Sequence, residues 1–201
     1  MIKVVLCDLG NVIVFFDDKK IAHGFAKFSD KDEEYIHKFF LNSMARKRFD
    51  VGKITAKQLF ADFKNKLNLK IGFSQFKKIW CSCFTGVNKD MMHLLNKLKK
   101  NYKLVLLSNT DEIHFTYLNN KHHLTEIFDD FVLSYKVGHM KPSPGIYLHA
   151  LKKAREFPTK VVYIDDIKTF VTASKLFGIK GIHYTNFEKL KKELRRLNIN
   201  A

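Results

Sequence analysis

The sequence predicts an α/β protein with a parallel β-sheet, helices on both faces of that sheet, and a helical insertion after the first strand. Short runs of branched apolar residues alternate with amphipathic segments at helical spacing through residues 1–16 and 88–201. The intervening residues 17–87 lack such runs and repeat phenylalanine and leucine at helical spacing. With 201 residues, 46% of them hydrophobic, the chain is long enough to bury a sizeable core.

The first predicted strand is the run Val4-Val5-Leu6-Cys7, which ends at Asp8 and is broken by Gly10. The apolar stretch 12–16 is expected to form a short hairpin or flap. Four further strands and five helices are predicted, with strands at 103–107, 131–134, 161–164 and 179–183, and helices at 91–98, 111–119, 146–155, 169–177 and 188–197. Such alternation is typical of a Rossmann-like parallel sheet built from βαβ units.

Residues 17–87 are predicted to form four or five helices without a strand. Their phenylalanines recur at helical spacing, which indicates a core rather than a ligand cage. Thr55 with Gln58 three residues later has the form of a capping box, so a helix is expected to begin there. We therefore divide the chain into an α/β core (1–16 and 88–201) and a helical insertion (17–87).

The net charge of +16 is compatible with a nucleic-acid partner, because such binding depends on neutralising phosphates. However, the lysines are scattered along the chain and interleaved with acids. The densest basic run, 189–196, alternates with Leu190, Leu194 and Leu197, which indicates the solvated face of an amphipathic helix. We expect no nucleic-acid partner, and a surface that attracts small anionic substrates.

The three cysteines, Cys7, Cys81 and Cys83, are too few and too irregularly spaced for a disulfide framework or a zinc site. A reduced, cytoplasmic setting is therefore predicted. Asp8 interrupts the apolar N-terminal run, which argues against a signal peptide, and no apolar run reaches the length of a membrane span. We expect no membrane partner; the oligomeric state is left open, with a monomer favoured.

Polar residues follow the strands at four places: Asp8, the pair Ser108-Asn109, the loop that holds Lys141, and the pair Asp165-Asp166. Carboxyl ends of parallel strands lie at one edge of the sheet, where ligands bind. Burying carboxylates is costly unless a cation or hydrogen bonds meet them. Three acids and one lysine at one edge therefore predict a site for a metal ion and a phosphate.

Four motifs in this order resemble those of the haloacid dehalogenase (HAD) superfamily of phosphatases: Asp8-Leu-Gly-Asn-Val12, Leu107-Ser-Asn-Thr110, Gly138-His-Met-Lys-Pro142 and Tyr163-Ile-Asp-Asp166. The resemblance covers nearly the whole chain and implies a HAD-like core with 17–87 as its small helical cap. Residues 48–55 are similar to a cap helix-loop of that superfamily. The first two motifs look closest to bacterial sugar-phosphate phosphatases, including those acting on glucose 1-phosphate.

The resemblance implies a Mg²⁺-dependent phosphomonoester hydrolase that acts on a small phosphorylated metabolite, such as a sugar phosphate, through an aspartyl-phosphate. Asp8 would be the nucleophile, and Lys141 would neutralise charge and orient it. The implied ligands of Mg²⁺ are Asp8, the Gly10 carbonyl, Asp165 and Asp166. The residues expected to bind the substrate and its phosphoryl oxygens are Ser108, Asn109 and Asn11.

Two positions depart from the family pattern. Gly10 stands where the family usually has a second aspartate, which acts as general acid and base. We therefore expect a slow phosphatase that prefers leaving groups needing little protonation, such as those of sugar 1-phosphates, acyl phosphates and aryl phosphates. Phe170 stands where relatives often carry asparagine, which concerns local rigidity rather than metal binding.

Two other interpretations stay open. A 2-haloacid dehalogenase-like hydrolase shares the fold and the aspartate nucleophile, but its fourth motif lacks the acid pair Asp165-Asp166. A catalytically impaired HAD protein acting as a binding module would also fit the absence of an acid at Gly10. The choice of substrate is expected to depend on cap residues above the site, around Phe16, His23, Met44, Arg46 and Arg48. Among the histidines, His23, His114 and His139 are expected to lie at the surface or to pack rather than to catalyse.

Overall fold

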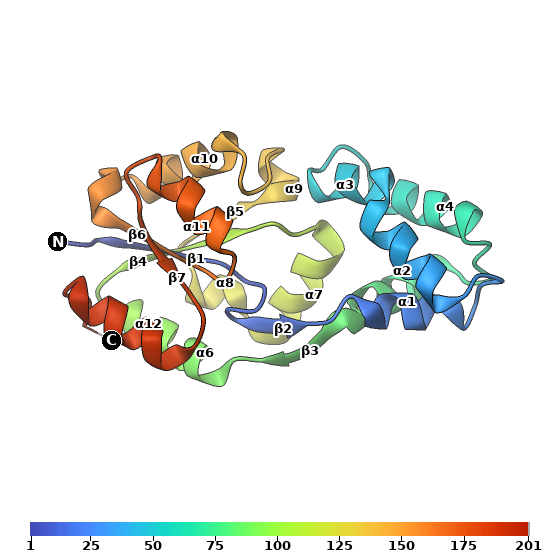
Figure 1. The fold of residues 1–201 in the computed structure, drawn as a ribbon, viewed down its shortest axis with the longest axis horizontal. Coiled ribbons are helices and arrows are strands. Elements are labelled where there is room, and N and C mark those ends of the chain that lie inside the picture. Colours follow the sequence, from blue (N-terminus) through green and yellow to red (C-terminus); the bar gives the residue numbers. More distant parts are fainter. Residues whose placement is uncertain (201) are drawn as a thin grey trace.

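A computed structural model describes residues 1–200, which fold around a five-stranded sheet with strand order β5-β4-β1-β6-β7 (Figure 1). In the central strand β1, Leu6 lies opposite Val105 of β4 and Tyr163 of β6. All four strand pairs are parallel, so the predicted α/β fold is confirmed. The strands are β1 (Val4–Cys7), β4 (Lys103–Ser108), β5 (Asp130–Leu133), β6 (Val161–Asp165) and β7 (Lys180–His183).

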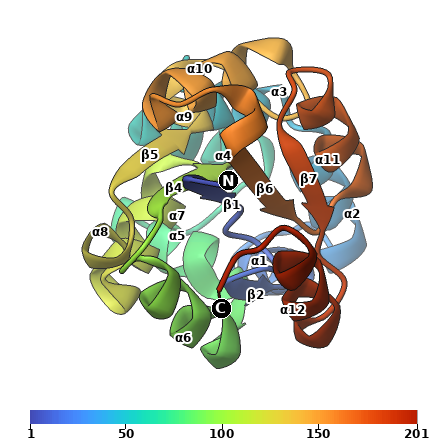
Figure 2. The ribbon, with the colours of Figure 1, turned by 90° about the vertical axis from the view of Figure 1, so that its left-hand side faces the viewer.

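Helices cover both faces of the sheet, and successive side chains of β1 pack into different layers (Figure 2). Val5 and Cys7 face one apolar core, and Val4 and Leu6 face the other. Burial of both faces of the central strand is typical of parallel sheets. The first core is covered by α6 (Lys89–Leu98), α7 (Glu112–His122), α8 (Leu124–Ile127) and α12 (Phe187–Arg196), and the second by α10 (Pro144–Ala154) and α11 (Lys168–Lys175).

A second group of helices, which we call the cap, lies at the opposite end of the molecule from the chain termini (Figure 1). It has its own aromatic core, in which Phe63, Phe76 and Trp80 lie with ring centroids 5.3–5.9 Å apart. The phenylalanine pattern therefore forms a core, as predicted, and the Thr55–Gln58 capping box is present. The cap helices are α1 (Lys19–Ala26), α2 (Glu33–Asn42), α3 (Met44–Asp50), α4 (Ala56–Lys66) and α5 (Phe73–Trp80).

A two-stranded antiparallel ribbon connects the cap to the α/β core. It pairs β2 (Val14–Phe16) with β3 (Phe84–Val87). The expectation that residues 17–87 contain no strand is therefore wrong. The sequence Phe-Thr-Gly-Val has no strong strand pattern of its own, and its hydrogen bonds come from a partner about 70 residues earlier in the chain. The division at residues 16/17 and 87/88 stays a prediction.

Short elements complete the fold: α9 (Ser134–Val137) and the 3₁₀ helices η1 (Cys81–Cys83) and η2 (Pro158–Lys160). Across residues 1–200, each helix falls short of the length or the hydropathy that a membrane span requires. The carboxyl ends of β1, β4 and β6 all point toward the cap, so the polar residues that follow these strands lie between the sheet and the cap helices.

Candidate active site

A cavity of about 310 Å³ lies between the carboxyl edge of the sheet and the cap. Its floor is formed by residues that follow the strands, and its roof by β2 and the cap helices α1–α3. All predicted site residues line the floor except Asp165, which is fully buried beneath it. The floor residues are Asp8, Gly10, Asn11, Ser108, Asn109, Lys141 and Asp166; the roof residues include Phe16, Asp18, Phe40, Arg46 and Asp50.

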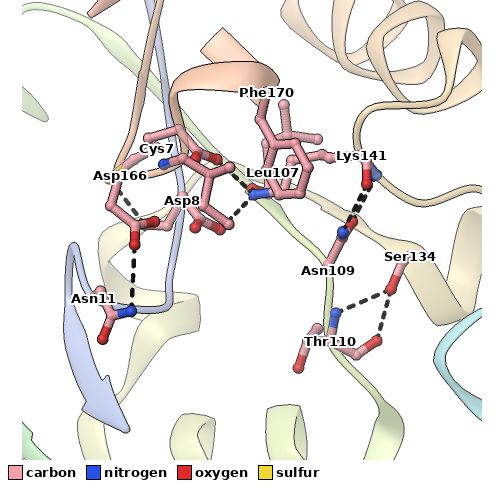
Figure 3. A network of polar contacts seen from close by, with 12 residues as sticks. Cys7, Asp8, Asn11, Leu107, Asn109, Thr110, Ser134, Lys141, Asp166 and Phe170 are labelled. Atoms are coloured by element: carbon pink, nitrogen blue, oxygen red, sulfur yellow. Dashed lines mark hydrogen bonds and ion pairs between the residues drawn. The ribbon is translucent and has the colours of Figure 1, made fainter. Parts of the chain in front are cut away.

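Lys141 is the centre of the floor network (Figure 3). Its Nζ lies 2.7 Å from Asp8 Oδ1 and 2.7 Å from Asp165 Oδ2, and it donates to the carbonyl of Leu107 at 3.2 Å. These three acceptors match the three N–H donors of an ammonium group. Burial by itself lowers the pKa of Lys141, but the charges of Asp8 and Asp165 raise it above its ordinary value. The side chain is therefore a fixed, permanent cation.

Both carboxylate oxygens of Asp165 accept hydrogen bonds from the protein. Its Oδ2 accepts hydrogen bonds from Lys141 and from the hydroxyl of Tyr163, and its Oδ1 accepts from the backbone N–H of Ile167 at 2.7 Å. Sequence reasoning missed the role of Tyr163. Tyr163 lies two residues before Asp165 on β6, and strand residues i and i+2 point to the same side of the sheet. This spacing could have indicated that the two side chains meet.

Asp8 and Asp166 lie beside Asp165, and their carboxylates have fewer contacts to the protein. Burial raises the pKa of Asp8 to about 6, with Lys141 opposing and Asp165 adding to the effect. Asn11 has a left-handed backbone (φ 54°), and its Nδ2 donates to Asp166 Oδ2 at 3.3 Å (Figure 3). One oxygen from each of the three aspartates lies within 4.8 Å of the others. Three carboxylates facing one lysine leave an excess of negative charge, which favours a cation.

The loop after β4 is fixed by contacts to neighbouring loops. Asn109 Oδ1 accepts from the backbone N–H of Lys141 at 2.7 Å, and its Nδ2 donates to the Lys141 carbonyl at 3.0 Å. Thr110 N–H donates to Ser134 Oγ at 2.9 Å, and that hydroxyl donates back to the Thr110 carbonyl at 2.8 Å. The Asn109 side chain is thus occupied in positioning Lys141. Ser108 and Asn109 both line the cavity.

Gly10 lies directly under an aromatic ring of the roof. A Cβ at this position would be 2.9 Å from Cε1 of Phe16, closer than side-chain carbons approach one another. The ring therefore occupies space next to the position where the family usually carries its second aspartate. Phe16 itself is 45% exposed, so the ring is held by few contacts on its outer side.

The roof contains charged residues that sequence reasoning singled out only in part. Of the cap residues expected to face the site, Phe16 and Arg46 line the cavity, whereas His23, Met44 and Arg48 do not. Asp18 and Asp50 were missed; Asp50 lies within residues 48–55, the segment similar to a cap helix-loop. Asp18 is the residue before α1 and its Oδ1 lies 3.2 Å from His37 Nε2.

His114, on α7, connects the α/β core to the cap. Its Nδ1 lies 2.8 Å from Asp111 Oδ2 and its Nε2 lies 2.8 Å from the carbonyl of Trp80. Because both neighbours are acceptors, both ring nitrogens must carry hydrogen, and the side chain is an imidazolium. Burial by itself lowers the pKa of His114, but Asp111 outweighs it and raises the pKa well above its ordinary value. Asp111 also accepts from Trp80 Nε1 at 3.0 Å.

The fold and the site together define a capped α/β enzyme with an aspartate at the end of its first strand, held by a buried lysine. A family model for haloacid dehalogenase-like hydrolases matches residues 2–177, and the chain belongs to this family. The superfamily that the four motifs predicted is therefore confirmed.

Two characterised relatives are phosphatases by name. The chain is 24% identical over 200 residues to D-ribitol-5-phosphate phosphatase from Bacteroides thetaiotaomicron, covering 96% of this chain and 97% of that protein. It is 34% identical over 84 residues to a phosphorylated carbohydrates phosphatase from Thermotoga maritima, covering 42% of this chain and 39% of that protein. Neither name refers to glucose 1-phosphate, the substrate of the phosphatases that the first two motifs resemble.

A solved structure from Bacteroides thetaiotaomicron, a HAD family enzyme in complex with magnesium and inorganic phosphate, has the same fold. It superposes with a TM-score of 0.85 at 23% identity, covering 94% of this chain and 99% of that chain. The similarity extends over the cap as well as the sheet, because nearly the full length of both chains is matched.

Proposed function

We propose that this chain is a magnesium-dependent phosphatase that hydrolyses a small sugar or polyol phosphate, with Asp8 as the nucleophile. The observation that carries the proposal is the Asp8 carboxylate at the floor of the cavity, 2.7 Å from Lys141 and next to Asp165 and Asp166. The names of the two relatives, which refer to ribitol 5-phosphate and to phosphorylated carbohydrates, support the substrate class. Glucose 1-phosphate belongs to the same class.

The donor set of the floor fits Mg²⁺. All three acids offer hard carboxylate oxygens, which Mg²⁺ prefers, and their charge exceeds that of Lys141. Asp8 and Asp166, together with the Gly10 carbonyl, would hold the ion directly. Asp165 would act through water, since its oxygens already accept three hydrogen bonds. When bound, Mg²⁺ would reduce the repulsion between the phosphate and Asp8.

The residues of the chain would divide the reaction into two displacements. A carboxylate oxygen of Asp8 attacks phosphorus, the bond to the leaving oxygen breaks, and an aspartyl-phosphate forms. Water then attacks this phosphorus while the bond from phosphorus to the Asp8 oxygen breaks, which releases inorganic phosphate and restores the Asp8 carboxylate. Lys141 orients Asp8 throughout, and Ser108 Oγ and the Asn109 backbone N–H would hold phosphoryl oxygens. Asn11 was expected to bind substrate; its contact to Asp166 supports a role in orienting that carboxylate.

Gly10 cannot give a proton to the leaving oxygen. General acid–base assistance is typically worth about 10²–10⁴-fold in rate, so leaving groups that need little protonation would react best. Sugar 1-phosphates, acyl phosphates and aryl phosphates are of this kind. We propose a slow phosphatase with this preference.

We further propose that the protein works as a monomer in the cytoplasm, with neither a membrane nor a nucleic acid as partner. The free and buried state of Cys7, Cys81 and Cys83 supports a reducing compartment. The alternation of acids with lysines on α12, including the 2.8 Å pair of Glu188 with Lys191, supports a solvated basic surface.

Hydrolysis of p-nitrophenyl phosphate with Mg²⁺, with EDTA, and by the Asp8→Asn variant tests the proposal. We expect turnover with Mg²⁺ that EDTA abolishes and that Asp8→Asn reduces by at least about 10³-fold. Asp90→Asn is the matched control, because Asp90 is exposed on α6 and does not line the cavity.

Turnover that persists in EDTA, or in Asp8→Asn, would overturn the proposal. Release of halide from 2-chloropropionate without metal would favour the dehalogenase instead. The absence of both reactions would favour the interpretation as an impaired enzyme that serves as a binding module.

A further inference from the structure

Helix α3 places two charged side chains of the cap above the catalytic floor. Arg46 and Asp50 are four residues apart on α3, so they lie on one face of the helix. Both line the cavity that contains Asp8 and Lys141. No catalytic step proposed above uses either of them.

The Asp50 carboxylate is largely buried yet accepts no hydrogen bond from residues 1–200. Its side chain is 14% exposed, and its nearest cation, Arg46 Nε, lies 3.7 Å from Oδ2, beyond hydrogen-bond length. Asp111, which is also buried near the roof, accepts from Trp80 Nε1, the His114 backbone and the His114 ring. Asp50 lines the cavity, where a ligand hydroxyl group could supply the hydrogen bond that residues 1–200 do not.

Arg46 is fixed beside it. The guanidinium lies over the ring of Phe40, with its carbon 4.1 Å from the ring centroid. Stacking of this kind holds the plane of the guanidinium and leaves its N–H edge free to donate. Arg46 and Asp50 therefore present a donor and an acceptor side by side at the roof.

We propose that Asp50 and Arg46 bind hydroxyl groups of the substrate and thereby select polyhydroxylated phosphates. The inference rests on the proposed phosphatase function and names the residues that would choose its substrate. A hydroxyl group can donate to the Asp50 carboxylate and accept from the Arg46 guanidinium at the same time.

The surroundings of Asp50 favour a neutral hydroxyl over an ammonium group. The charged groups around it are Arg46 on its own helix, Asp111 just before α7, and His114 on α7. Two of these three are cations, so the carboxylate already has charge partners and lacks only hydrogen-bond donors. Burial raises the pKa of Asp50 to about 6, which is consistent with a carboxylate that has lost water without gaining donors.

The size of the cavity limits the substrate to a small molecule. Its volume of about 310 Å³ is at the lower end of the range for small-molecule sites. A ligand with its phosphate at Asp8 and a short carbon chain would fill the space up to the roof. Phe16, Phe84, Met140 and Phe170 form an apolar part of the wall. Among the other charged residues near the roof, Asp18 is paired with His37, and Asp111 is paired with His114, so Asp50 and Arg46 are the pair that a hydroxyl group would meet.

The test compares phosphates with and without hydroxyl groups. The kcat/KM values for ribitol 5-phosphate, glucose 1-phosphate, acetyl phosphate and phosphoethanolamine are measured for the wild type, Asp50→Asn and Arg46→Gln. We expect each variant to lower the ratio of the polyhydroxylated substrates to acetyl phosphate by about 10- to 100-fold, as for the loss of one hydrogen bond to a charged group. Glu34→Gln, an exposed acid on α2, should keep the wild-type ratio.

A binding measurement keeps the inference independent of turnover. Ribitol 5-phosphate and inorganic phosphate are each titrated calorimetrically into the Asp8→Asn variant and into the double variant that also has Asp50→Asn. The difference between the two variants gives the contribution of Asp50 to the affinity for each ligand. We expect Asp50→Asn to weaken ribitol 5-phosphate about 10-fold or more and to affect inorganic phosphate much less.

Equal weakening of both ligands, or an unchanged substrate ratio, would overturn the inference. A wild-type preference for phosphoethanolamine that Asp50→Asn removes would assign Asp50 to an ammonium group instead. Failure of the proposed function looks different, because it appears as absent hydrolysis of all four phosphates by the wild type while the binding experiment still gives an answer.

Discussion

The floor and the roof of the cavity contain similar numbers of charged side chains but pair them differently. On the floor, Lys141 meets three acceptors, and the two oxygens of Asp165 accept from Lys141, Tyr163 and Ile167. On the roof, the carboxylate of Asp50 has only a cation at 3.7 Å. Lys141 and Asp165 are thus fully hydrogen-bonded within the protein, whereas the Asp50 carboxylate accepts no hydrogen bond from the described part of the chain.

This difference matches a division of labour between chemistry and recognition. A nucleophile works best when its neighbours are fixed before the substrate arrives, because no reorganisation is then needed during the reaction. A recognition site gains affinity and selectivity when its polar groups find their partners only in the correct ligand. The floor has the first property and α3 has the second.

The largest effect is expected from breaking the floor with Lys141→Met. The change removes the cation shared by Asp8 and Asp165 and leaves two buried carboxylates side by side. We expect kcat/KM for p-nitrophenyl phosphate to fall by at least about 10³-fold. Lys152→Met, at an exposed position of α10, is the control and should change little. A loss of less than tenfold would contradict the central role of Lys141.

The next effect concerns the contact between cap and core, and is tested with His114→Gln. This change leaves Asp111 buried without its charged partner, so we expect the free energy of unfolding to fall by about 3–5 kcal/mol at pH 7 in urea titrations. Because the pKa of His114 is raised in the folded state, its stabilisation is complete below its unfolded pKa of about 6.5. The stabilisation is then lost as the pH rises through the higher folded value.

His93→Gln provides the control for this measurement, because His93 is exposed on α6. It should change the free energy of unfolding by less than about 0.5 kcal/mol. If the difference between the wild type and His114→Gln were to grow toward alkaline pH, His114 would not be a cation in the folded protein.

A third prediction concerns the effect of the roof residue Asp50 on the free energy of unfolding. Asp50 has its pKa raised to about 6, so its ionised form is unfavourable in the folded protein. This penalty is absent below the unfolded pKa of about 3.9 and is complete above about pH 6. Asp50→Asn should therefore be more stable than the wild type by up to about 3 kcal/mol at pH 7.5, although it binds substrate less well.

Urea titrations of both proteins at pH 4.5 and pH 7.5 check this prediction, with Glu34→Gln as the control. The gain should be small at the lower pH. A loss of stability at pH 7.5 would mean that Asp50 forms stabilising contacts, and the roof would then resemble the floor.

The sequence predicts the floor well and the roof poorly, for a physical reason. Asp8, Ser108, Lys141 and Asp165 follow predicted strands, and parallel strands bring their carboxyl ends together whatever the details of the side chains. Asp50 lies on a helix whose position depends on packing against distant residues, so its spacing in the sequence does not say what it faces. The same holds for β3, which becomes a strand only by pairing with β2.

The smallest expected effect is a gain, and it tests why the floor has Gly10 instead of an acid. Gly10→Asp would restore the position that the family usually uses for proton transfer. Its Cβ would meet the Phe16 ring at 2.9 Å, so the ring must turn away, and we expect little gain from this change alone. In the double variant with Phe16→Ala, we expect turnover of ribitol 5-phosphate to rise about tenfold over Phe16→Ala alone.

The gain should depend on the leaving group, because a general acid helps only where the departing oxygen needs a proton. Turnover of p-nitrophenyl phosphate, whose leaving group is a weak base, should rise much less than that of the alkyl phosphate. Gly10→Asn with Phe16→Ala has nearly the same shape and no acid, and it should show no gain. A similar rise with asparagine would trace the effect to the space vacated by Phe16, and the missing proton donor would then not limit this enzyme.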